Sequence, residues 1–314
     1  MIKPAITAEQ LLKRLEWTVL RRLDGLLQGD YRTLLRGTGM DLADLREYQH
    51  HDDVRHIDWN VTARLQQPHV RVFTEDREMS AWFLLDLSPS MDFGSGEQRK
   101  RDVSTQLVAV LARMLSRHGN RVGAMLYGSG VDSVIPARGG RQHVLQLLHT
   151  LQKRPETLPV GPTRLHELLE SAARLVHRRS TLFVVSDFIS ESGWEKPLGM
   201  LAQRHEVVAV RLIDPLELQL PNLGLIPIRD AETGEQLLVD TNNAGFRKRF
   251  ARIAAQREAD LRQTLVRAGV DALELSTDDD LVNALVRFTD MRKRRSRLSG
   301  GTAGRLPAHL QQAA

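Results

Sequence analysis

The sequence predicts an α/β fold in which a mostly parallel sheet is covered by helices on both faces. Two observations support this prediction. Short and almost wholly apolar runs, such as 81–85 and 182–185, have the composition of strands buried on both sides. They alternate with longer segments whose apolar residues recur every three to four positions, as in amphipathic helices. A strand, a helix and a further strand form a right-handed crossover, which makes the two strands parallel.

The first element is an amphipathic helix expected over residues 7–27, with leucine and valine at helical spacing and Gly29-Asp30 as its end. Residues 31–77 are irregular and rich in charge, and they close on a short strand-like stretch at 69–73.

Strands and helices alternate over the rest of the folded region, which we expect to span 80–291. Their expected order is strand 82–87, helix 101–118, strand 121–127, helix 142–152, helix 164–178, strand 182–186, helix 194–204, strand 207–213, helix 246–268, strand 272–275 and helix 280–291. A β-hairpin is expected as an insertion after the strand 207–213, with arms at 224–228 and 236–240.

Composition restricts the function classes. The chain of 314 residues has no cysteine, which excludes disulfides, thiolate metal sites and cysteine nucleophiles and fits a reducing cytoplasm. It has no run of 18 apolar residues and no signal-peptide core, so we expect a cytoplasmic protein without a transmembrane segment.

The positive charge is concentrated at the carboxyl end. The formal net charge is +5, but residues 292–314 hold six basic residues and no acid, which leaves residues 1–291 at −1. We therefore expect three parts: a segment 1–79 packed on the main domain, the main domain 80–291, and a disordered basic tail 292–314. Nucleic-acid binding is not expected from a nearly neutral folded body.

A candidate metal site begins where the strand 82–87 ends. Asp86-Leu87-Ser88-Pro89-Ser90 places an acid and two hydroxyls at alternate positions, and oxygen ligands suit Mg²⁺ or Mn²⁺. Thr163 precedes a helical pattern and Asp187 ends a second apolar strand. Open α/β sheets bind ligands outside the carboxyl ends of their strands, so these five residues are expected to converge there. Read singly, each has a simpler interpretation: the first three as turn residues and Thr163 as a helix N-cap.

This order of motifs resembles the von Willebrand factor A domain and its metal-ion-dependent adhesion site. The segment before it, with Arg36-Gly37-Thr38-Gly39-Met40, Leu45-Arg46-Glu47-Tyr48, 52–60 and Thr62-Ala63-Arg64, resembles the signature of the bacterial family known as domain of unknown function fifty-eight. The resemblance implies a von Willebrand factor A-like, Rossmann-like fold. It also implies a metal site at Asp86, Ser88, Ser90, Thr163 and Asp187 that keeps one coordination position for an external ligand.

The resemblance also implies a role. Family members are typically encoded beside MoxR-type AAA+ ATPases, which suggests a non-catalytic adaptor for such an ATPase and an unknown protein client. The signature residues are expected to be structural or to bind a partner: Arg46, Tyr48, Asp52, Asp53, Arg55, Asp58, Trp59 and Arg64. The sequence departs from the family pattern at His50-His51, where a Gly-bearing pair is usual, and at Leu42, where Phe is usual.

An enzymatic alternative uses the same signature. His50, His51, Asp52 and Asp58, together with Asp53 and His56, could bind Zn²⁺, Mn²⁺ or Fe and generate hydroxide for a phosphohydrolase or nuclease. All six residues lie within nine positions, whereas catalytic centres usually draw ligands from several elements, which favours a structural role in which Asp53, Arg55 and Asp58 form a hydrogen-bonded cluster and Trp59 is the apolar anchor. Common nucleophile-elbow, phosphate-loop and zinc-protease motifs are absent from the sequence.

Overall fold

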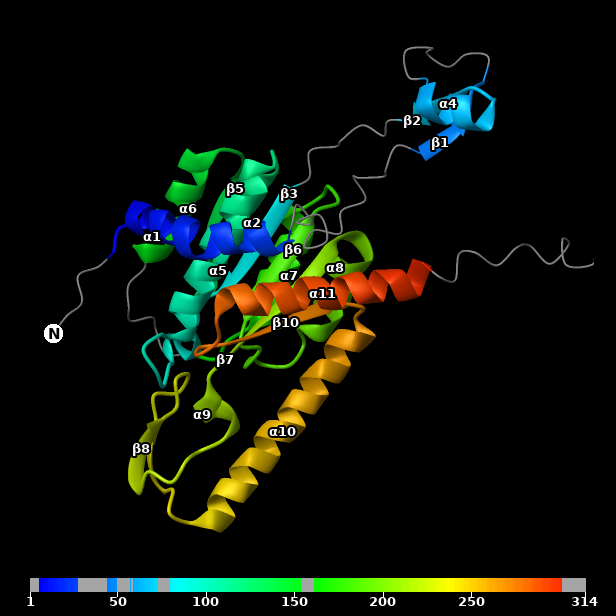
Figure 1. Ribbon diagram of the computed structural model, residues 1–314. Helices are drawn as coiled ribbons and strands as arrows, with labels where there is room; N and C mark the ends of the chain where they lie inside the picture. Colours follow the sequence, from blue (N-terminus) through cyan, green and yellow to red (C-terminus); the bar gives the residue numbers. More distant parts are fainter. Residues whose placement is uncertain are drawn as a thin grey trace, which may run out of the picture. The chain divides into compact units, whose positions relative to one another are not determined.

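A six-stranded sheet forms the centre of the larger of two compact units in the computed structural model (Figure 1). The structure describes residues 6–27, 44–49, 57, 59–72, 80–153 and 161–300. The larger unit comprises Met1–Arg36 and Ser80–Ala314, and the smaller one is Gly37–Met79.

The sheet has the strand order β10-β7-β6-β3-β4-β5. Its strands are β3 (Ser80–Asp86), β4 (Arg121–Tyr127), β5 (Val131–Arg138), β6 (Thr181–Ser186), β7 (Glu206–Ile213) and β10 (Asp271–Ser276). All neighbours are parallel except β4 and β5. Numbered along the chain and read from β5, the order is 3-2-1-4-5-6, that of doubly wound folds. The predicted, mostly parallel α/β sheet is therefore confirmed.

Helices cover both faces of this sheet, because successive strand residues point to opposite sides. Ala81, Phe83 and Leu85 belong to one apolar core, whereas Trp82 and Leu84 belong to the other. The first core is closed by α1 (Ala8–Leu15), a π-helical turn (Glu16–Leu20), α2 (Arg21–Leu27), α5 (Lys100–Arg117), α6 (Arg141–Gln152) and α11 (Leu281–Gly300). The second is closed by α7 (Leu165–Leu175), α8 (Glu195–Arg204) and α10 (Ala244–Arg267).

The amino-terminal helices are part of the larger unit's core. Thr7 accepts from the Gln10 backbone N–H at 3.2 Å, and Gln10 Oε1 accepts from the Thr7 N–H at 3.0 Å, which forms a capping box. Leu12 and Leu23 are fully buried in that core. The amphipathic pattern over 7–27 therefore predicted a real helical segment, with a π-helical turn inside it.

Two parts of the fold differ from the expectation. The edge strand β5 was not predicted; exposed residues alternate with residues that are partly buried or, at Ile135, buried, so it lacks the continuous apolar run of the inner strands. The second difference is the carboxyl-terminal boundary. Helix α11 continues past residue 291 to Gly300, and the buried Arg292 forms ion pairs with Glu206 and Asp271. The expected tail therefore begins too early at 292.

The larger unit also has a hairpin after β7, as predicted. Helix α9 (Pro215–Leu218) follows β7, and strands β8 (Leu225–Arg229) and β9 (Gln236–Asp240) pair antiparallel. Figure 1 shows α9 and β8 beyond the sheet end where β7 is labelled.

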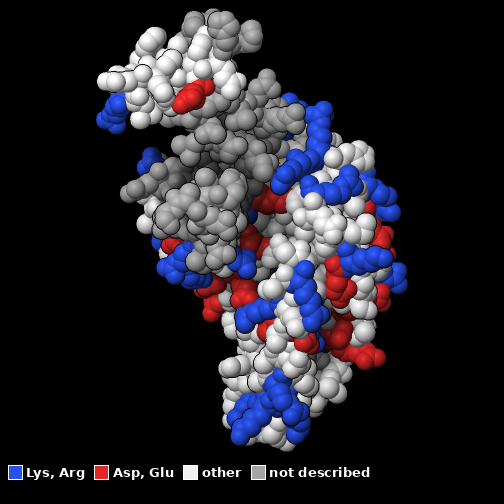
Figure 2. Space-filling view, turned by 90° about the vertical axis from the view of Figure 1, so that its right-hand side faces the viewer, with Lys and Arg blue, Asp and Glu red and all other residues white. Residues whose placement is uncertain are grey.

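Figure 2 shows basic side chains gathered at the lower end of the larger unit, at the height at which α10 begins in Figure 1. The exposed residues Lys248, Arg249 and Arg252 lie in these first turns.

The smaller unit holds the described part of the signature segment. Strand β1 (Asp44–Glu47) pairs antiparallel with β2 (His69–Val72), and α4 (Trp59–Leu65) lies between them in the chain. Arg46 is on β1, Tyr48 donates its backbone N–H to Pro68 O at 2.8 Å, and Arg64 is exposed on α4. Trp59 is 70% exposed, so it is not a core residue of this unit. Its packing against the main domain stays a prediction.

The remaining signature residues lie outside the described residues: His50, His51, Asp52, Asp53, Arg55, His56 and Asp58. Within the described ranges, no helix is long and apolar enough to cross a membrane.

Candidate metal centre

The candidate site lies where the winding of the sheet reverses. From β3 the chain builds outward through β4 and β5, and it then returns to place β6 on the other side of β3. Asp86 is the last residue of β3, and Asp187 follows the last residue of β6. These two carboxylates therefore flank the switch point, the place where doubly wound sheets bind their ligands.

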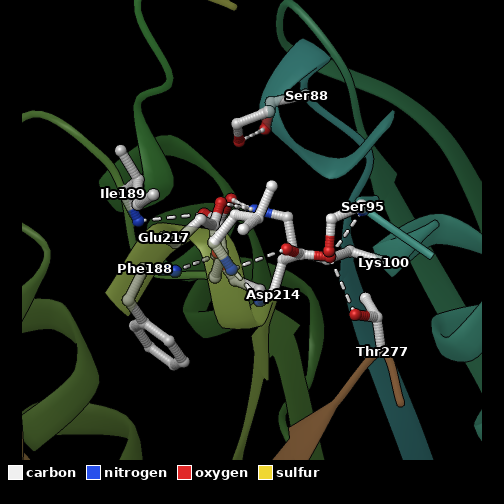
Figure 3. A network of polar contacts seen from close by, with 12 residues as sticks. Ser88, Ser95, Lys100, Phe188, Ile189, Asp214, Glu217 and Thr277 are labelled. Atoms are coloured by element: carbon white, nitrogen blue, oxygen red, sulfur yellow. Dashed lines mark hydrogen bonds and ion pairs between the residues drawn. The ribbon is translucent and has the colours of Figure 1, made fainter. Parts of the chain in front are cut away.

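Asp86 is fully buried and held by two donors. Its Oδ1 accepts from the Ser88 backbone N–H at 2.9 Å, and its Oδ2 accepts from the Ser186 hydroxyl at 2.6 Å. The short 3₁₀ helix Pro89–Asp92 then turns the chain so that the hydroxyls of Ser88 and Ser90 lie 3.2 Å apart (Figure 3). The motif thus forms a buried cluster of oxygens rather than an exposed turn.

Asp187 is held on both carboxylate oxygens. Oδ1 accepts from the Ile189 N–H at 2.9 Å, and Oδ2 accepts from Lys100 Nζ at 2.7 Å. The residue after it, Phe188, has a φ of 57°, a left-handed backbone conformation that is strained for an aromatic residue. The ring of Phe188 packs 5.4 Å from that of Trp194 in the second core, which holds this sharp bend in place.

Thr163 lies in a third loop, at the same edge of the sheet as Asp86 and Asp187. Its carbonyl accepts from the Ser190 hydroxyl and from the Glu191 N–H, both at 2.9 Å, so its loop is fixed to the loop of Asp187. The Thr163 side chain is 1% exposed, yet its Oγ1 has no hydrogen-bond partner within the described structure. The N-cap of α7 is Arg164, so the simpler interpretation of Thr163 as a helix cap is wrong.

A buried lysine supplies positive charge beneath the cluster. Lys100, the first residue of α5, is 0% exposed and donates to Asp187 and, at 2.5 Å, to Glu217 Oε1. The other oxygen of Glu217 accepts from the Asp214 N–H at 3.0 Å. Asp214, at the end of β7, accepts from the Ser95 N–H and the Thr277 hydroxyl, both at 2.8 Å (Figure 3). Several strand ends are therefore joined in one polar network.

The pKa values follow from this burial. Burial and the nearby charge of Asp187 raise the pKa of Asp86 to about 6. The hydrogen bonds from Ser186 and Ser88 act in the opposite direction and lower this pKa. Burial also raises the pKa of Glu217, although Lys100 acts in the opposite direction. Burial alone would lower the pKa of Lys100, but Asp187 and Glu217 outweigh it and raise that pKa. At neutral pH the lysine thus neutralises one carboxylate.

The remaining charge fits a divalent cation. Asp86, Asp187 and Glu217 share one ammonium group, that of Lys100, so these four groups carry a net charge of −2 when all are ionised. Uncompensated buried charge is unfavourable, and a dication would neutralise it. The unpartnered Thr163 hydroxyl and the two serine hydroxyls add neutral oxygen ligands of the kind that Mg²⁺ and Mn²⁺ accept. The donor set therefore fits the predicted ion.

Comparison with known proteins identifies the family. The model of the family described as "Protein of unknown function DUF58" matches residues 44–260. The chain belongs to this family. It is 38% identical over 286 residues to "Uncharacterized protein Rv1480" of Mycobacterium tuberculosis, an alignment that covers 90% of this chain and 89% of that one. The mycobacterial protein "Mb1516" of Mycobacterium bovis matches to the same extent.

Solved structures with similar folds have much lower identity. BatB from Bacteroides thetaiotaomicron is 14% identical, with a TM-score of 0.43, and covers 69% of this chain and 99% of its own. The SpRpn10 VWA domain is also 14% identical, with a TM-score of 0.35, and covers 67% of this chain and 94% of its own.

The sequence pointed to the five oxygen-bearing residues of the candidate site but not to the groups that hydrogen-bond to them. Lys100 reads as an ordinary basic residue at the start of a helix, and no sequence signal marks it as buried. Glu217 could have been found, because Asp214-Pro215-Leu216-Glu217 has the spacing of a capping box, and Asp214 does accept from the Leu216 N–H at 3.0 Å. The pattern would have revealed the turn but not its ion pair with Lys100.

The hydrolytic alternative cannot be placed on this site. Its candidate ligands, His50, His51, Asp52 and Asp58, lie outside the described residues. Among the residues that are described, no group of three or more His, Asp or Glu side chains is arranged to hold a metal ion. The candidate centre at the switch point has two such carboxylates and depends on hydroxyls for its other ligands.

Proposed function

We propose that this DUF58 protein is a non-catalytic adaptor that uses a divalent cation, Mg²⁺ or Mn²⁺, to bind an acidic side chain of a protein partner. The cation would be held by five oxygen-bearing residues: Asp86, Ser88, Ser90, Thr163 and Asp187. The observation that carries this proposal is the buried Thr163 hydroxyl, which has no hydrogen-bond partner among the described residues and lies at the same sheet edge as the carboxylates of Asp86 and Asp187.

Charge explains why the partner residue would be acidic. Two carboxylates balance a dication, and hydroxyl ligands add no negative charge, so a bound ion would remain attractive to an incoming Asp or Glu. The protein's own part is to orient the oxygens: Ser186 and the Ser88 N–H fix Asp86, and Lys100 fixes Asp187. These contacts hold the ligands rigidly before the ion binds.

The partner that we propose is a MoxR-type AAA+ ATPase, which would act on a protein client with the adaptor's help. This part of the proposal rests on membership of the DUF58 family, because the resemblance of the chain to that family implies an association with such an ATPase. A cytoplasmic location belongs to the same proposal, since an AAA+ ATPase needs ATP.

The first test is direct metal binding by isothermal titration of the full chain with Mg²⁺ and Mn²⁺. We expect wild type to bind one ion and Asp86→Asn to show no heat of binding, because the substitution keeps the size of the side chain and removes its charge. Asp92→Asn is the matched control: Asp92 is a nearby acid whose charge is paired with Arg101 at 2.8 Å. Undiminished binding by folded Asp86→Asn would refute the site.

A further inference from the structure

The tip of the β8–β9 hairpin is a rigid turn. Asp230 Oδ1 accepts from the N–H groups of Glu232 and Thr233, both at 2.8 Å. Gly234, with a φ of 75°, donates its N–H to Asp230 O at 3.0 Å and closes the turn. A left-handed residue at this point favours glycine. The turn therefore fixes the direction in which the Glu232 side chain leaves the backbone.

This tip reaches the candidate metal centre. Glu232 Oε1 accepts from the Thr163 N–H at 3.3 Å, a contact between residues 69 positions apart in the chain. Glu232 is partly buried, whereas Thr233 and Glu235, on the same turn, are exposed. A hairpin tip is usually surrounded by water, so the burial of this one acid shows that it lies against the loop of Thr163.

The contact brings a carboxylate close to the unpartnered hydroxyl. Three covalent bonds separate the backbone nitrogen of Thr163 from its Oγ1, so the two atoms lie within about 4 Å of each other in any rotamer. Glu232 binds the first of these atoms, and the second is buried without a hydrogen-bond partner in the part of the chain that the structure describes. A cation bound by the Thr163 hydroxyl oxygen would therefore be close to Glu232. A small rotation of the Glu232 side chain would bring its carboxylate to the ion.

We propose that Glu232 coordinates the cation directly from the hairpin. It occupies, from within the same chain, the coordination position that the proposed function leaves for a partner's acid. This inference rests on the proposed function and adds regulation to it: an incoming Asp or Glu must displace Glu232, and the hairpin lowers the affinity of the free protein for weak acidic ligands. The inserted hairpin thereby selects for partners that bind strongly enough to move it.

The test counts the water molecules on a bound ion. Water-proton relaxation of the full chain loaded with Mn²⁺ reports the number of fast-exchanging inner-sphere waters, and titration gives the Mn²⁺ dissociation constant. In Glu232→Ala we expect one more water than in wild type and a dissociation constant raised by at least about tenfold, because an anionic ligand is lost. Glu235→Ala, from the same turn, is the matched control and should behave as wild type. Glu232→Gln should weaken binding in the same direction as Glu232→Ala.

The outcomes separate this inference from the proposed function. If Mn²⁺ binds wild type and Glu232→Ala with equal affinity and equal water number, the metal site stands and the role of Glu232 is refuted. If wild type binds no Mn²⁺, the proposed function fails and the inference fails with it. A change of the same size in Glu235→Ala would show a general effect of charge on the turn and would also refute direct coordination.

Discussion

Lys100 donates to Asp187 at 2.7 Å in a setting where neither side chain is more than 1% exposed. The lysine begins α5 and the aspartate follows β6, so this ion pair joins two elements that flank the switch point. The same ammonium also binds Glu217, which belongs to α9. One buried cation thus fixes a proposed metal ligand and the start of the inserted hairpin region, and it keeps the charge of the cluster within what a dication can balance.

The first prediction concerns this lysine. Lys100→Met should lower the free energy of unfolding by about 3–5 kcal/mol, because it leaves Asp187 and Glu217 buried without their cation. Urea denaturation of the metal-free protein measures the loss. Lys13→Met is the control: Lys13 pairs with Glu9 at 3.4 Å on the surface, and its loss should cost less than about 0.5 kcal/mol. Equal losses in the two variants would contradict the buried pair.

The second prediction concerns the unpartnered hydroxyl. Thr163→Val should leave the stability of the metal-free protein unchanged or raise it by up to about 1 kcal/mol, because the hydroxyl it removes is buried and forms no hydrogen bond with any described residue. The same variant should bind Mg²⁺ at least about tenfold more weakly. Denaturant melts and isothermal titration measure the two effects.

Thr181→Val is the matched control for that prediction. Thr181 is also buried on the sheet, but its hydroxyl donates to Glu206 at 3.1 Å, so its removal should cost about 1 kcal/mol and leave metal affinity unchanged. If Thr163→Val instead destabilised the metal-free protein as much as Thr181→Val, the Thr163 hydroxyl would have a partner in solution. The observation that carries the proposed function would then be lost.

The fold could be predicted because its inner strands are apolar throughout and its helices have one apolar face. These patterns are local, so β3, β6 and β7 and the helices between them could be read from the sequence. The edge strand β5 escaped because only one of its eight residues, Ile135, is buried. The boundary at 291 was wrong because Arg292 looks like the first residue of a basic tail, whereas its charge is neutralised by Glu206 and Asp271, which are distant in the chain.

The candidate site could be predicted only in part for a related reason. Asp86, Ser88 and Ser90 are close in sequence, and Asp187 ends a recognisable strand. Lys100 contacts Asp187, 87 positions away in the chain, and Glu232 contacts Thr163, 69 positions away. The residues next to Lys100 and Glu232 in the sequence do not indicate these contacts. Candidate ligands that follow strand ends are therefore readable from a sequence, whereas the groups that contact them through tertiary structure depend on how the loops pack.

The third prediction tests the corrected boundary. Arg292→Met should lower the free energy of unfolding by about 3–5 kcal/mol, because the guanidinium is 3% exposed and its loss removes an ion pair from Glu206 and one of the two ion pairs of Asp271. Arg294→Met, two residues later and exposed on the same helix, should stay within about 0.5 kcal/mol of wild type. Equal stability of wild type and Arg292→Met in urea would contradict the buried ion pairs and would support a folded domain that ends at residue 291.

The last prediction links the metal to the partner. The double variant Ser88→Ala/Ser90→Ala should weaken the complex with the MoxR-type ATPase to a similar degree as removal of the ion by EDTA. EDTA should have no further effect on the double variant. Both treatments remove the same coordination bond to the partner, and groups that act as one unit give non-additive losses. Co-purification and a binding titration, each with Mg²⁺ or EDTA, measure the four combinations.

The sheet itself offers the control for this experiment. Ser80 and Ser180 form a second hydroxyl pair, 2.7 Å apart, at the amino ends of β3 and β6, the opposite edge of the same two strands. Ser80→Ala, Ser180→Ala should therefore bind the ATPase as wild type does and remain fully sensitive to EDTA. If EDTA and the serine variants left the complex unchanged, the cation would be structural and the partner would bind elsewhere. If the two losses instead added, the serines would contact the partner independently of the ion, because only a shared coordination bond makes the second loss vanish.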